Sequence, residues 1–469
     1  MWLCGCSAAP LPFGMADAGV DAAPAIDLAM PPDLAPPPLV KTRFLDGTNL
    51  MLAGVTADDW VAYYNGNFGN ALNVAPIGGG APQPIAKNAF AAISGRVIFA
   101  FANYDAMTYS AELYAWSSTS NGAQLISSKS SYLAYAATRD GKSILYLDNY
   151  DPMNARADVV IASLDKSFSR TVFAQVDTRM CPPGAVGAGD RFVVAHCPAG
   201  MTTAGVDTVD EGGNVTSLQP KAFDYVTIDA AGDRVLFVDA LGTAIVADPD
   251  GKNAAKFGGN ISYCFLSVDG AGADCQTFNG GIVKGLPASG QTVPFVNQGV
   301  AGMWGASPNA DAALYYTQFD MMTGHADFRL ASAAGARTLL ADATGCTYGD
   351  LFTVDGLHAL FLADCNQSYV GKLNAADTLV DQTKAISTST WVAWGAHDPL
   401  VAYNDNYAQA GLGNGRADLL VADLSSSDPP RTVEKAAEVD FFLTRDRARA
   451  VYSFQAVAGA EGLYVVTLP

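Results

Sequence analysis

A unit of four short strand-like segments recurs along the chain from about residue 41 onward, and no other feature constrains the fold as strongly. The most complete copy spans residues 132–174, where apolar segments alternate with polar turns, a pattern typical of short β-strands. Its four predicted strands are residues 133–137, 143–147, 158–162 and 170–174. The first turn is Thr138-Arg139-Asp140-Gly141, in which Gly accepts a positive φ and Asp can hydrogen-bond to its own backbone.

The same kind of turn precedes the second predicted strand of other copies. It occurs as Thr56-Ala57-Asp58, Asp229-Ala230-Ala231-Gly232-Asp233, Ser267-Val268-Asp269-Gly270, Ser307-Pro308-Asn309, Thr353-Val354-Asp355-Gly356 and Thr444-Arg445-Asp446. The strands that follow these turns and their counterparts are centred near residues 62, 98, 145, 193, 236, 276, 314, 360, 401 and 451. A four-stranded repeat of about 36 to 50 residues is typical of one blade of a β-propeller.

We therefore expect an all-β protein, a β-propeller of four-stranded antiparallel blades with about ten repeat units. These units would form about seven to ten blades in one ring, or two smaller rings. Tandem β-sandwiches are an alternative, but they would show larger units of about seven strands. A right-handed β-solenoid would show shorter repeats.

Two turn segments carry a resemblance to a known family. Ser307-Pro308-Asn309 and Thr138-Arg139-Asp140-Gly141-Lys142, each followed by an apolar strand, resemble the TolB-like, WD-like propeller repeat. The resemblance covers most of residues 50–468, although the paired Trp-Asp signatures of eukaryotic WD propellers are absent. It implies a propeller that binds partners within complexes of the bacterial envelope.

The last unit is one strand short, with predicted strands at residues 439–443, 450–454 and 463–468. A spare strand-like segment, residues 41–45, stands at the beginning of the repeats. We expect this segment to complete the last blade, because such a pairing removes the open sheet edges on which aggregation starts.

The N-terminus resembles a bacterial lipobox in Leu3-Cys4-Gly5-Cys6, which implies that Cys6 is lipidated and that residues 1–6 are a truncated lipoprotein signal whose true start lies upstream. Ser7 is similar to the residue that sends lipoproteins to the outer membrane. Residues 7–40 hold eight Pro and no Lys or Arg, so we expect a disordered linker at most about 100 Å long. The propeller would then occupy residues 41–469.

Six cysteines lie in the repeats, and taken in order they pair as Cys181 with Cys197, Cys264 with Cys275 and Cys346 with Cys365. Each pair flanks the turn between the first and second strands of a unit, where neighbouring antiparallel strands can bring Cα atoms within disulfide distance. Three disulfides would indicate an oxidising compartment, the periplasm or the cell surface. Six free thiols are the alternative.

Four units share an unusual connection between their second and third strands, made of an amide, an aromatic residue and a carboxylate. These connections are Asn103-Tyr104-Asp105 to Glu112, Asn149-Tyr150-Asp151 to Asp158, Gln318-Phe319-Asp320 to Asp327, and Asn406-Tyr407 to Asp418. Such side chains could bind a sugar or a peptide, or hold Ca²⁺ through their oxygens. Alternatively, the Asn and Asp residues stabilise turns and the aromatic residues pack between blades.

Trp304 and Trp394 end the first strands of two units, which would line the central channel. They could stack on a ligand or pack against the next blade.

Composition excludes several functions. A net charge of −19 and a pI near 4.4 argue against nucleic-acid binding, and no run of 18 apolar residues encodes a membrane-spanning helix. The histidines His196, His325, His358 and His397 belong to different units, and no HExxH, GxSxG or phosphate-binding loop occurs.

We therefore expect a monomeric, non-catalytic module, without a cofactor other than the possible Ca²⁺, that binds an envelope protein, a peptide or a glycan. The alternative is an extracytoplasmic hydrolase or lyase acting on envelope polysaccharide or peptide.

Overall fold

The structure is a computed structural model that describes residues 39–66, 70–179, 181–198, 201, 203–344, 352–363, 367–373, 379–387, 393–396, 399–408, 415–424, 426, 428–438 and 440–469. The predicted lipidation at Cys6, the linker and the pair Cys346–Cys365 lie outside the described residues. Within them, no helix is both long enough and apolar enough to span a bilayer.

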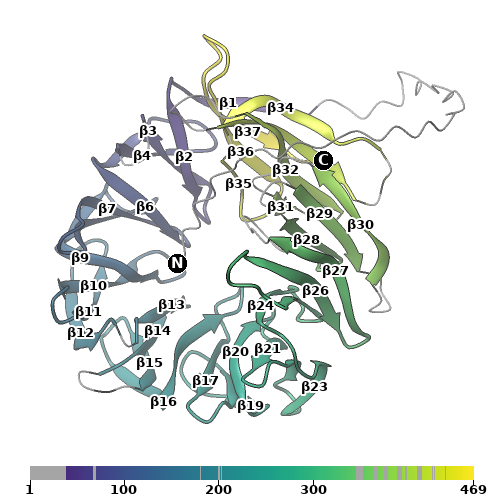
Figure 1. Cartoon of the computed structure of the whole chain (residues 1–469). Coiled ribbons are helices and arrows are strands. Elements are labelled where there is room, and N and C mark those ends of the chain that lie inside the picture. Colours follow the sequence, from purple (N-terminus) through teal and green to yellow (C-terminus); the bar gives the residue numbers. More distant parts are fainter. Residues whose placement is uncertain are drawn as a thin grey trace, which may run out of the picture. The chain divides into compact units, whose positions relative to one another are not determined.

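The described part of residues 39–469 consists of β-strands in eight antiparallel sheets (Figure 1). Five sheets are four-stranded or three-stranded units in chain order: β2 (Leu50–Val55), β3 (Trp60–Asn65), β4 (Ala71–Pro76) and β5 (Gln83–Ala86); β20 (Ile261–Leu266), β21 (Ala273–Thr277), β22 (Ile282–Leu286) and β23 (Gln291–Val296); β24 (Gly302–Ala306), β25 (Ala312–Thr317), β26 (His325–Ser332) and β27 (Gly335–Thr344); β28 (His358–Ala363), β29 (Gln367–Leu373) and β30 (Leu379–Ser387); β31 (Ala393–Gly395), β32 (Leu400–Ala408), β33 (Arg416–Asp423) and β34 (Arg431–Glu438). A sixth contains β1 (Lys41–Asp46), β37 (Gly462–Thr467), β36 (Arg449–Phe454) and β35 (Phe441–Leu443).

The remaining two sheets each have seven strands because two units share one long strand. The first contains β6 (Ala89–Ser94), β7 (Val97–Asp105), β8 (Ser110–Ser117), β9 (Gln124–Ala137), β10 (Ser143–Asp151), β11 (Arg156–Ser163) and β12 (Ser169–Asp177). The second contains β13 (Gly184–Ala188), β14 (Arg191–His196), β15 (Ala204–Asp210), β16 (Val215–Ile228), β17 (Val235–Asp239), β18 (Ala244–Ala247) and β19 (Ala255–Phe257).

The shared strands differ from the expectation that every unit is a separate sheet. The first half of β9 pairs with β8 and its second half with β10. The pairing with β10 shifts register between Tyr135 and Ser131, so one 14-residue strand ends one unit and begins the next. The four strands predicted for residues 132–174 are present and correspond to the end of β9 and to β10, β11 and β12.

The predicted recurring turn has a common hydrogen-bond pattern. In the turn between β9 and β10, the Thr138 hydroxyl donates to Asp140 at 2.9 Å and accepts from the Ser143 amide at 3.1 Å. The same pair of contacts forms at Thr56, Ser267, Ser307, Thr353 and Thr444. At Ser307 the acceptor is the side chain of Asn309 in place of an Asp. Because the hydroxyl makes hydrogen bonds within the turn, Ser or Thr recurs two residues before the Asp or Asn in these copies.

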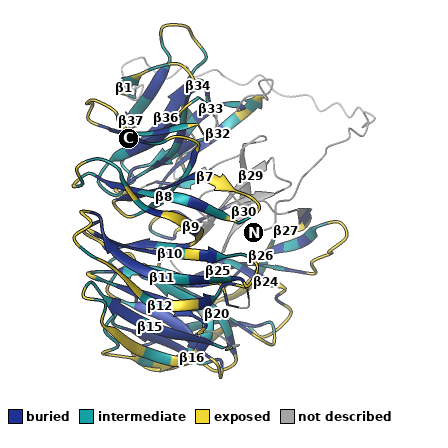
Figure 2. Cartoon of the chain, turned by 90° about the vertical axis from the view of Figure 1, so that its left-hand side faces the viewer, coloured by how far each residue is buried: buried dark blue, intermediate teal, exposed yellow. Residues whose placement is uncertain are grey.

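Neighbouring sheets pack face to face through buried strands. On β7, Phe99 and Phe101 belong to a core cluster with Tyr146 of β10, whereas Ala100 belongs to a cluster with Tyr64 of β3. Both faces of β7 are therefore buried, and burial follows the strands while exposed residues gather at the turns (Figure 2). Each fully buried Phe contributes about 1.5–3 kcal/mol, so inter-sheet packing supplies much of the stability.

The first described strand, β1, belongs to the last sheet, and this sheet also packs against the sheet of β2 to β5. β1 pairs antiparallel with β37, from Lys41 opposite Val466 to Asp46 opposite Gly462. Leu50 and Val61 of the first sheet share a core cluster with Val451 and Leu463 of the last.

Two of the three expected disulfides lie in the described residues, Cys181–Cys197 and Cys264–Cys275. Both flank a turn between first and second strands, as predicted. Disulfides are typical of proteins outside the reducing cytosol.

Candidate functional site

The antiparallel topology separates the loops into two sets. Since successive turns of a meander lie at alternate ends of the strands, the turns between second and third strands share one end with the connections from one unit to the next. With the four strands of each unit lettered A to D in chain order, we call this end of the strands the BC edge. The turns between first and second strands and between third and fourth strands lie at the opposite end, the AB edge.

The four predicted connections all lie at the BC edge and share one local structure. Asn103, Asn149 and Asn406 adopt a left-handed backbone with φ of 51°, 50° and 54°, and Gln318 does so with φ of 56°. The three Asn amides donate to a carboxylate on the third strand: Asn103 to Glu112 at 3.0 Å, Asn149 to Asp158 at 3.0 Å and Asn406 to Asp418 at 2.9 Å. Asn tolerates this backbone better than most residues, which explains its recurrence.

The third-strand carboxylates also bind the fourth strand. The second oxygen of Asp158 accepts from the backbone amide of Gln175 at 2.9 Å, and Asp418 accepts from Ala436 at 2.9 Å. Asp327 makes the same contact with the amide of Asp342 at 3.0 Å. Burial acts to raise the pKa of Asp158, but its hydrogen bonds with Asn149 and Gln175 outweigh this and lower it.

The carboxylates that follow the aromatic residues close the hairpin turns. The Asp105 carboxylate accepts from the amide of Met107 at 2.8 Å, and Asp320 accepts from the amide of Met322 at 2.8 Å. These amide contacts are the main reason that the pKa values of both carboxyls are lowered. Asp151 accepts from the backbone amide of Met153 at 2.9 Å in the same way, and the side-chain amide of Asn154, which donates to it at 2.7 Å, is the main reason that its pKa is lowered. The contacts favour the structural interpretation of the Asn and Asp residues.

The aromatic members of the connections behave differently. Tyr104 packs edge-on against Tyr132 and Phe90, at centroid distances of 5.7 and 6.1 Å, and is 37% exposed. Desolvation, followed by the nearby Tyr132, raises the pKa of Tyr104 to about 12. Tyr109 is exposed nearby, whereas Tyr150 of the next unit is buried. Phe319 is 48% exposed and packs on Tyr316. Tyr104, Tyr132 and Tyr109 thus form an accessible aromatic cluster.

The sequence analysis did not predict a row of exposed apolar side chains that the structure shows at the BC edge. In the described part of the chain, seven turns between second and third strands each carry an apolar side chain that is more than half exposed. These side chains are Met107, Met153, Met201, Leu241, Phe278, Met321 with Met322, and Val457. A signal was present in three copies, because Met107, Met153 and Met322 each follow the turn Asp by two residues.

The two predicted tryptophans are not brought together. Trp304 packs against Phe328 with ring centroids 4.8 Å apart. Trp394 lies at the AB edge beside Phe442, with the Arg447 guanidinium 5.9 Å from its ring centre. It lines a cavity of about 290 Å³ between turns of the first and last units, together with Thr56.

The described histidines lie apart. His196 bonds Asp207 through Nε2 at 2.8 Å, and the buried His196 ring stacks on Phe173 with ring centroids 3.8 Å apart. His325 contacts Asp342 at 3.2 Å on the exposed BC edge. Within the described ranges, no group of three or more His, Cys, Asp or Glu residues is arranged to hold a metal ion.

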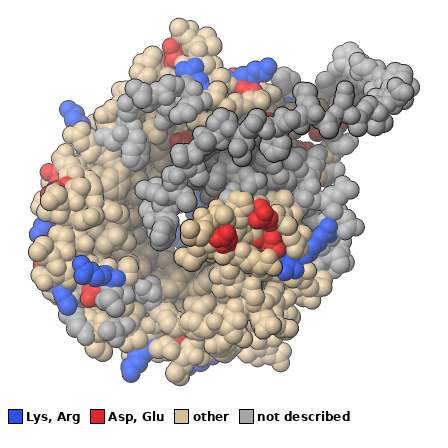
Figure 3. Space-filling model, in the orientation of Figure 1, with Lys and Arg blue, Asp and Glu red and all other residues tan. Residues whose placement is uncertain are grey.

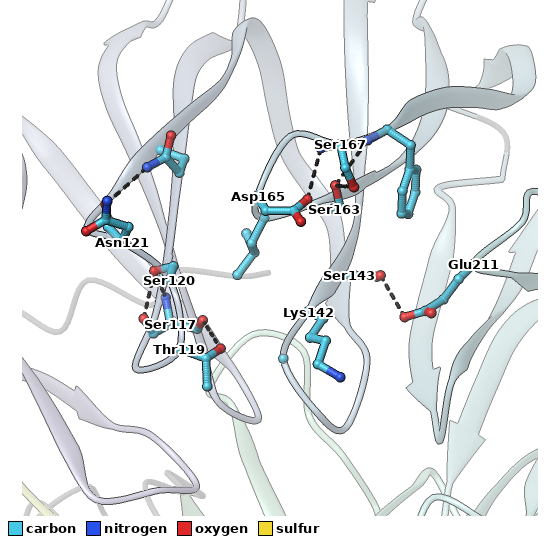
Figure 4. Close-up of a pocket in the computed structure, with 14 residues that line it drawn as sticks. Ser117, Thr119, Ser120, Asn121, Lys142, Ser143, Ser163, Asp165, Ser167 and Glu211 are labelled. Atoms are coloured by element: carbon cyan, nitrogen blue, oxygen red, sulfur yellow. Dashed lines mark hydrogen bonds between the residues drawn. The ribbon is translucent and has the colours of Figure 1, made fainter.

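A second cavity, of about 650 Å³, opens at the AB edge between three consecutive units (Figure 4). Its lining comes from turns that no sequence motif connects, which is why the sequence reading missed it. Most of the lining side chains carry hydroxyl, amide or charged groups.

Comparison with known proteins gives matches among solved structures alone. No protein-family model matches this chain, and no curated protein matches it significantly. Among solved structures, it is similar to the C-terminal WD40 domain of Sif2, at 11% identity and a TM-score of 0.42 over 91% of this chain and 99% of that one. It is also similar to an oligogalacturonate lyase from Vibrio parahaemolyticus, at 12% identity and a TM-score of 0.35 over 63% of this chain and 96% of that one.

A third similar structure is the dihydro-heme d1 dehydrogenase NirN, at 14% identity and a TM-score of 0.39 over 72% of this chain and 74% of that one. All three are β-propellers with different functions, so the likeness concerns the fold alone.

Proposed function

We propose that this chain is an extracytoplasmic, lipid-anchored β-propeller that binds a partner protein of the envelope through its BC edge. The observation that supports the proposal is the row of exposed apolar side chains on successive turns of that edge. Exposed apolar groups gathered on one side of a protein are characteristic of interaction surfaces.

The exposed apolar side chains of the BC edge are better suited to bind a protein partner than a glycan. Met107 is 85% exposed, Met153 is 87% exposed and Leu241 is 86% exposed. Burying one such side chain is worth about 1.5–3 kcal/mol, and Met adapts its shape to irregular partner surfaces. The Asn and Asp groups that would recognise sugar hydroxyls are instead bonded within the turns. On the face shown in Figure 3, most of the visible surface is uncharged, apart from a group of acidic side chains near the middle of the view and separate charged side chains toward the rim.

We expect the cluster of Tyr104, Tyr109 and Tyr132 to contribute much of the binding energy of this surface. Tyr104, Tyr109 and Tyr132 lie beside the turns that carry Met107 and Met153, on two adjacent units. Tyrosines of this kind dominate the binding energy of many protein interfaces, since they bury a large area and keep a polar hydroxyl at the rim.

The proposal also includes a lipid anchor at the N-terminus and closure of the repeat units into one ring. Lipidation of Cys6 and a linker over residues 7–40 would hold the propeller off the outer membrane, and the two disulfides support an oxidising location. Ten units in one closed ring are supported by the pairing of β1 with β37 and by the core cluster shared between the first and last sheets. We propose a monomer.

The test is capture of partners from envelope extract with purified chain. The BC-edge variant replaces Met107, Met153 and Phe278 with Ser. The matched control replaces three exposed AB-edge residues, Val215, Val268 and Leu357, with Ser. We expect a stoichiometric partner that the BC-edge variant loses and the control retains. Equal capture by both variants would refute a partner site at this edge.

A further inference from the structure

The AB-edge cavity has walls from four turns of three units. These are the turn between β8 and β9, the turn between β9 and β10, the turn between β11 and β12, and the turn after β15 (Figure 4). A volume of about 650 Å³ lies within the range of small-molecule sites in proteins. The cavity is distinct from the proposed partner surface, which lies at the opposite ends of the strands.

Each wall is held in place by its own hydrogen bonds. The Ser117 hydroxyl lies 3.1 Å from that of Thr119, and Ser120 donates to the Ser117 carbonyl at 2.7 Å. On another wall, the Ser163 and Ser167 hydroxyls are 3.1 Å apart. These bonds fix the positions of the hydroxyl oxygens before a ligand arrives, which lowers the entropy lost on binding.

Charges of both signs face the same space. Asp165 is kept ionised by the Ser163 hydroxyl and the Ser167 amide, which lower its pKa to about 2. Glu211 accepts from the Ser143 hydroxyl through Oε1 at 2.7 Å. Lys142 contacts Asp140 at 3.0 Å and belongs to the lining of the cavity. An anion would meet two carboxylates here, and an amine would meet an ammonium group.

From these features we propose that the cavity binds a neutral saccharide. Each sugar hydroxyl both donates and accepts a hydrogen bond, as do the Ser and Thr hydroxyls and the Asn121 and Gln124 amides that line the walls. The Asp165 and Glu211 carboxylates accept from sugar hydroxyls, and Lys142 donates to them. Phe168 adds the apolar surface on which the C–H face of a sugar ring packs. A neutral polyhydroxylated ligand is therefore the class of ligand that can form hydrogen bonds with the polar groups of every wall.

The test is isothermal titration of the whole chain with cellobiose, maltose and N,N′-diacetylchitobiose. Sodium phosphate and spermidine serve as the anionic and cationic comparison ligands. We expect saturable binding of at least one disaccharide, with Kd on the order of 1 mM or tighter, and none of phosphate or spermidine.

Two variants locate the site. Thr119 is exposed at the cavity, so Thr119→Trp should fill it and weaken disaccharide binding at least tenfold. Glu211→Gln should weaken it by a smaller factor, while Leu357→Ser, at the AB edge of another unit, should leave it unchanged. Thermal melting of each variant checks folding. Failure of all three disaccharides to bind, binding of phosphate or spermidine alone, or equal affinity of a folded Thr119→Trp variant would each overturn the proposal.

Discussion

Replacing Asp158 with Ala tests whether the recurrent carboxylates stabilise the fold. The change removes a hydrogen bond of 3.0 Å from Asn149 and one of 2.9 Å from the amide of Gln175. Hydrogen bonds to charged groups contribute roughly 1.5–3 kcal/mol each, and partial exposure of Asp158 places these at the lower end. Asn149 and Gln175 also have a positive φ, which needs support from their surroundings. We expect the free energy of unfolding to fall by about 2–4 kcal/mol.

Urea unfolding followed by tryptophan fluorescence measures this change. Because the pKa of Asp158 is lowered in the folded chain, its stabilising effect is present above its ordinary pKa of 3.8 and is lost as the pH falls through the folded value. The difference between wild type and Asp158→Ala should therefore shrink below about pH 4. Met153→Ala, on the same hairpin but 87% exposed, is the matched control and should change little. A loss below about 0.5 kcal/mol at pH 7 would refute the structural role.

Three further outcomes are expected. Burial raises the pKa of Asp274 to about 8, so wild type should lose stability as the pH rises from about 4 to 8, and Asp274→Asn should flatten this dependence in urea unfolding; an unchanged slope would contradict the burial effect. Deletion of residues 41–46 should lower the melting temperature by several degrees, because β37 loses its partner strand and Phe44 and Leu45 no longer pack on the core; an equal melting temperature would exclude that pairing. Mass spectrometry without reductant should find Cys181–Cys197 and Cys264–Cys275 bonded, and free thiols at these positions would remove the case for an oxidising compartment.

Much of the fold could be predicted because its signals are local. The Thr138–Asp140 contact and the Ser143 amide bond lie within six consecutive residues, so the turn can be recognised wherever its residues recur. The pairing of the two disulfides followed from the same periodicity: Cys264–Cys275 joins the neighbouring strands β20 and β21, and Cys181–Cys197 joins the residues that flank the hairpin of β13 and β14. The joining of units through β9 was not predicted, since whether a strand bends or breaks between two sheets depends on the register that its neighbours impose.

The candidate sites depend on tertiary structure. An amino-acid pattern places Asn149 and Asp158 on one hairpin. Only the fold shows that the backbone amide of Gln175, on the next strand, donates a hydrogen bond to the Asp158 carboxylate. Exposure of Met107 and Met153 is decided by which turns lack a covering neighbour.

By itself, the amino-acid sequence determined the four-stranded unit, its turn chemistry and the order of the strands, because these arise from residues a few positions apart. Only the tertiary structure decided which side chains gather at each edge. The AB-edge cavity joins Ser117 to Glu211 across three units, and no local pattern encodes a contact between turns that far apart in the chain.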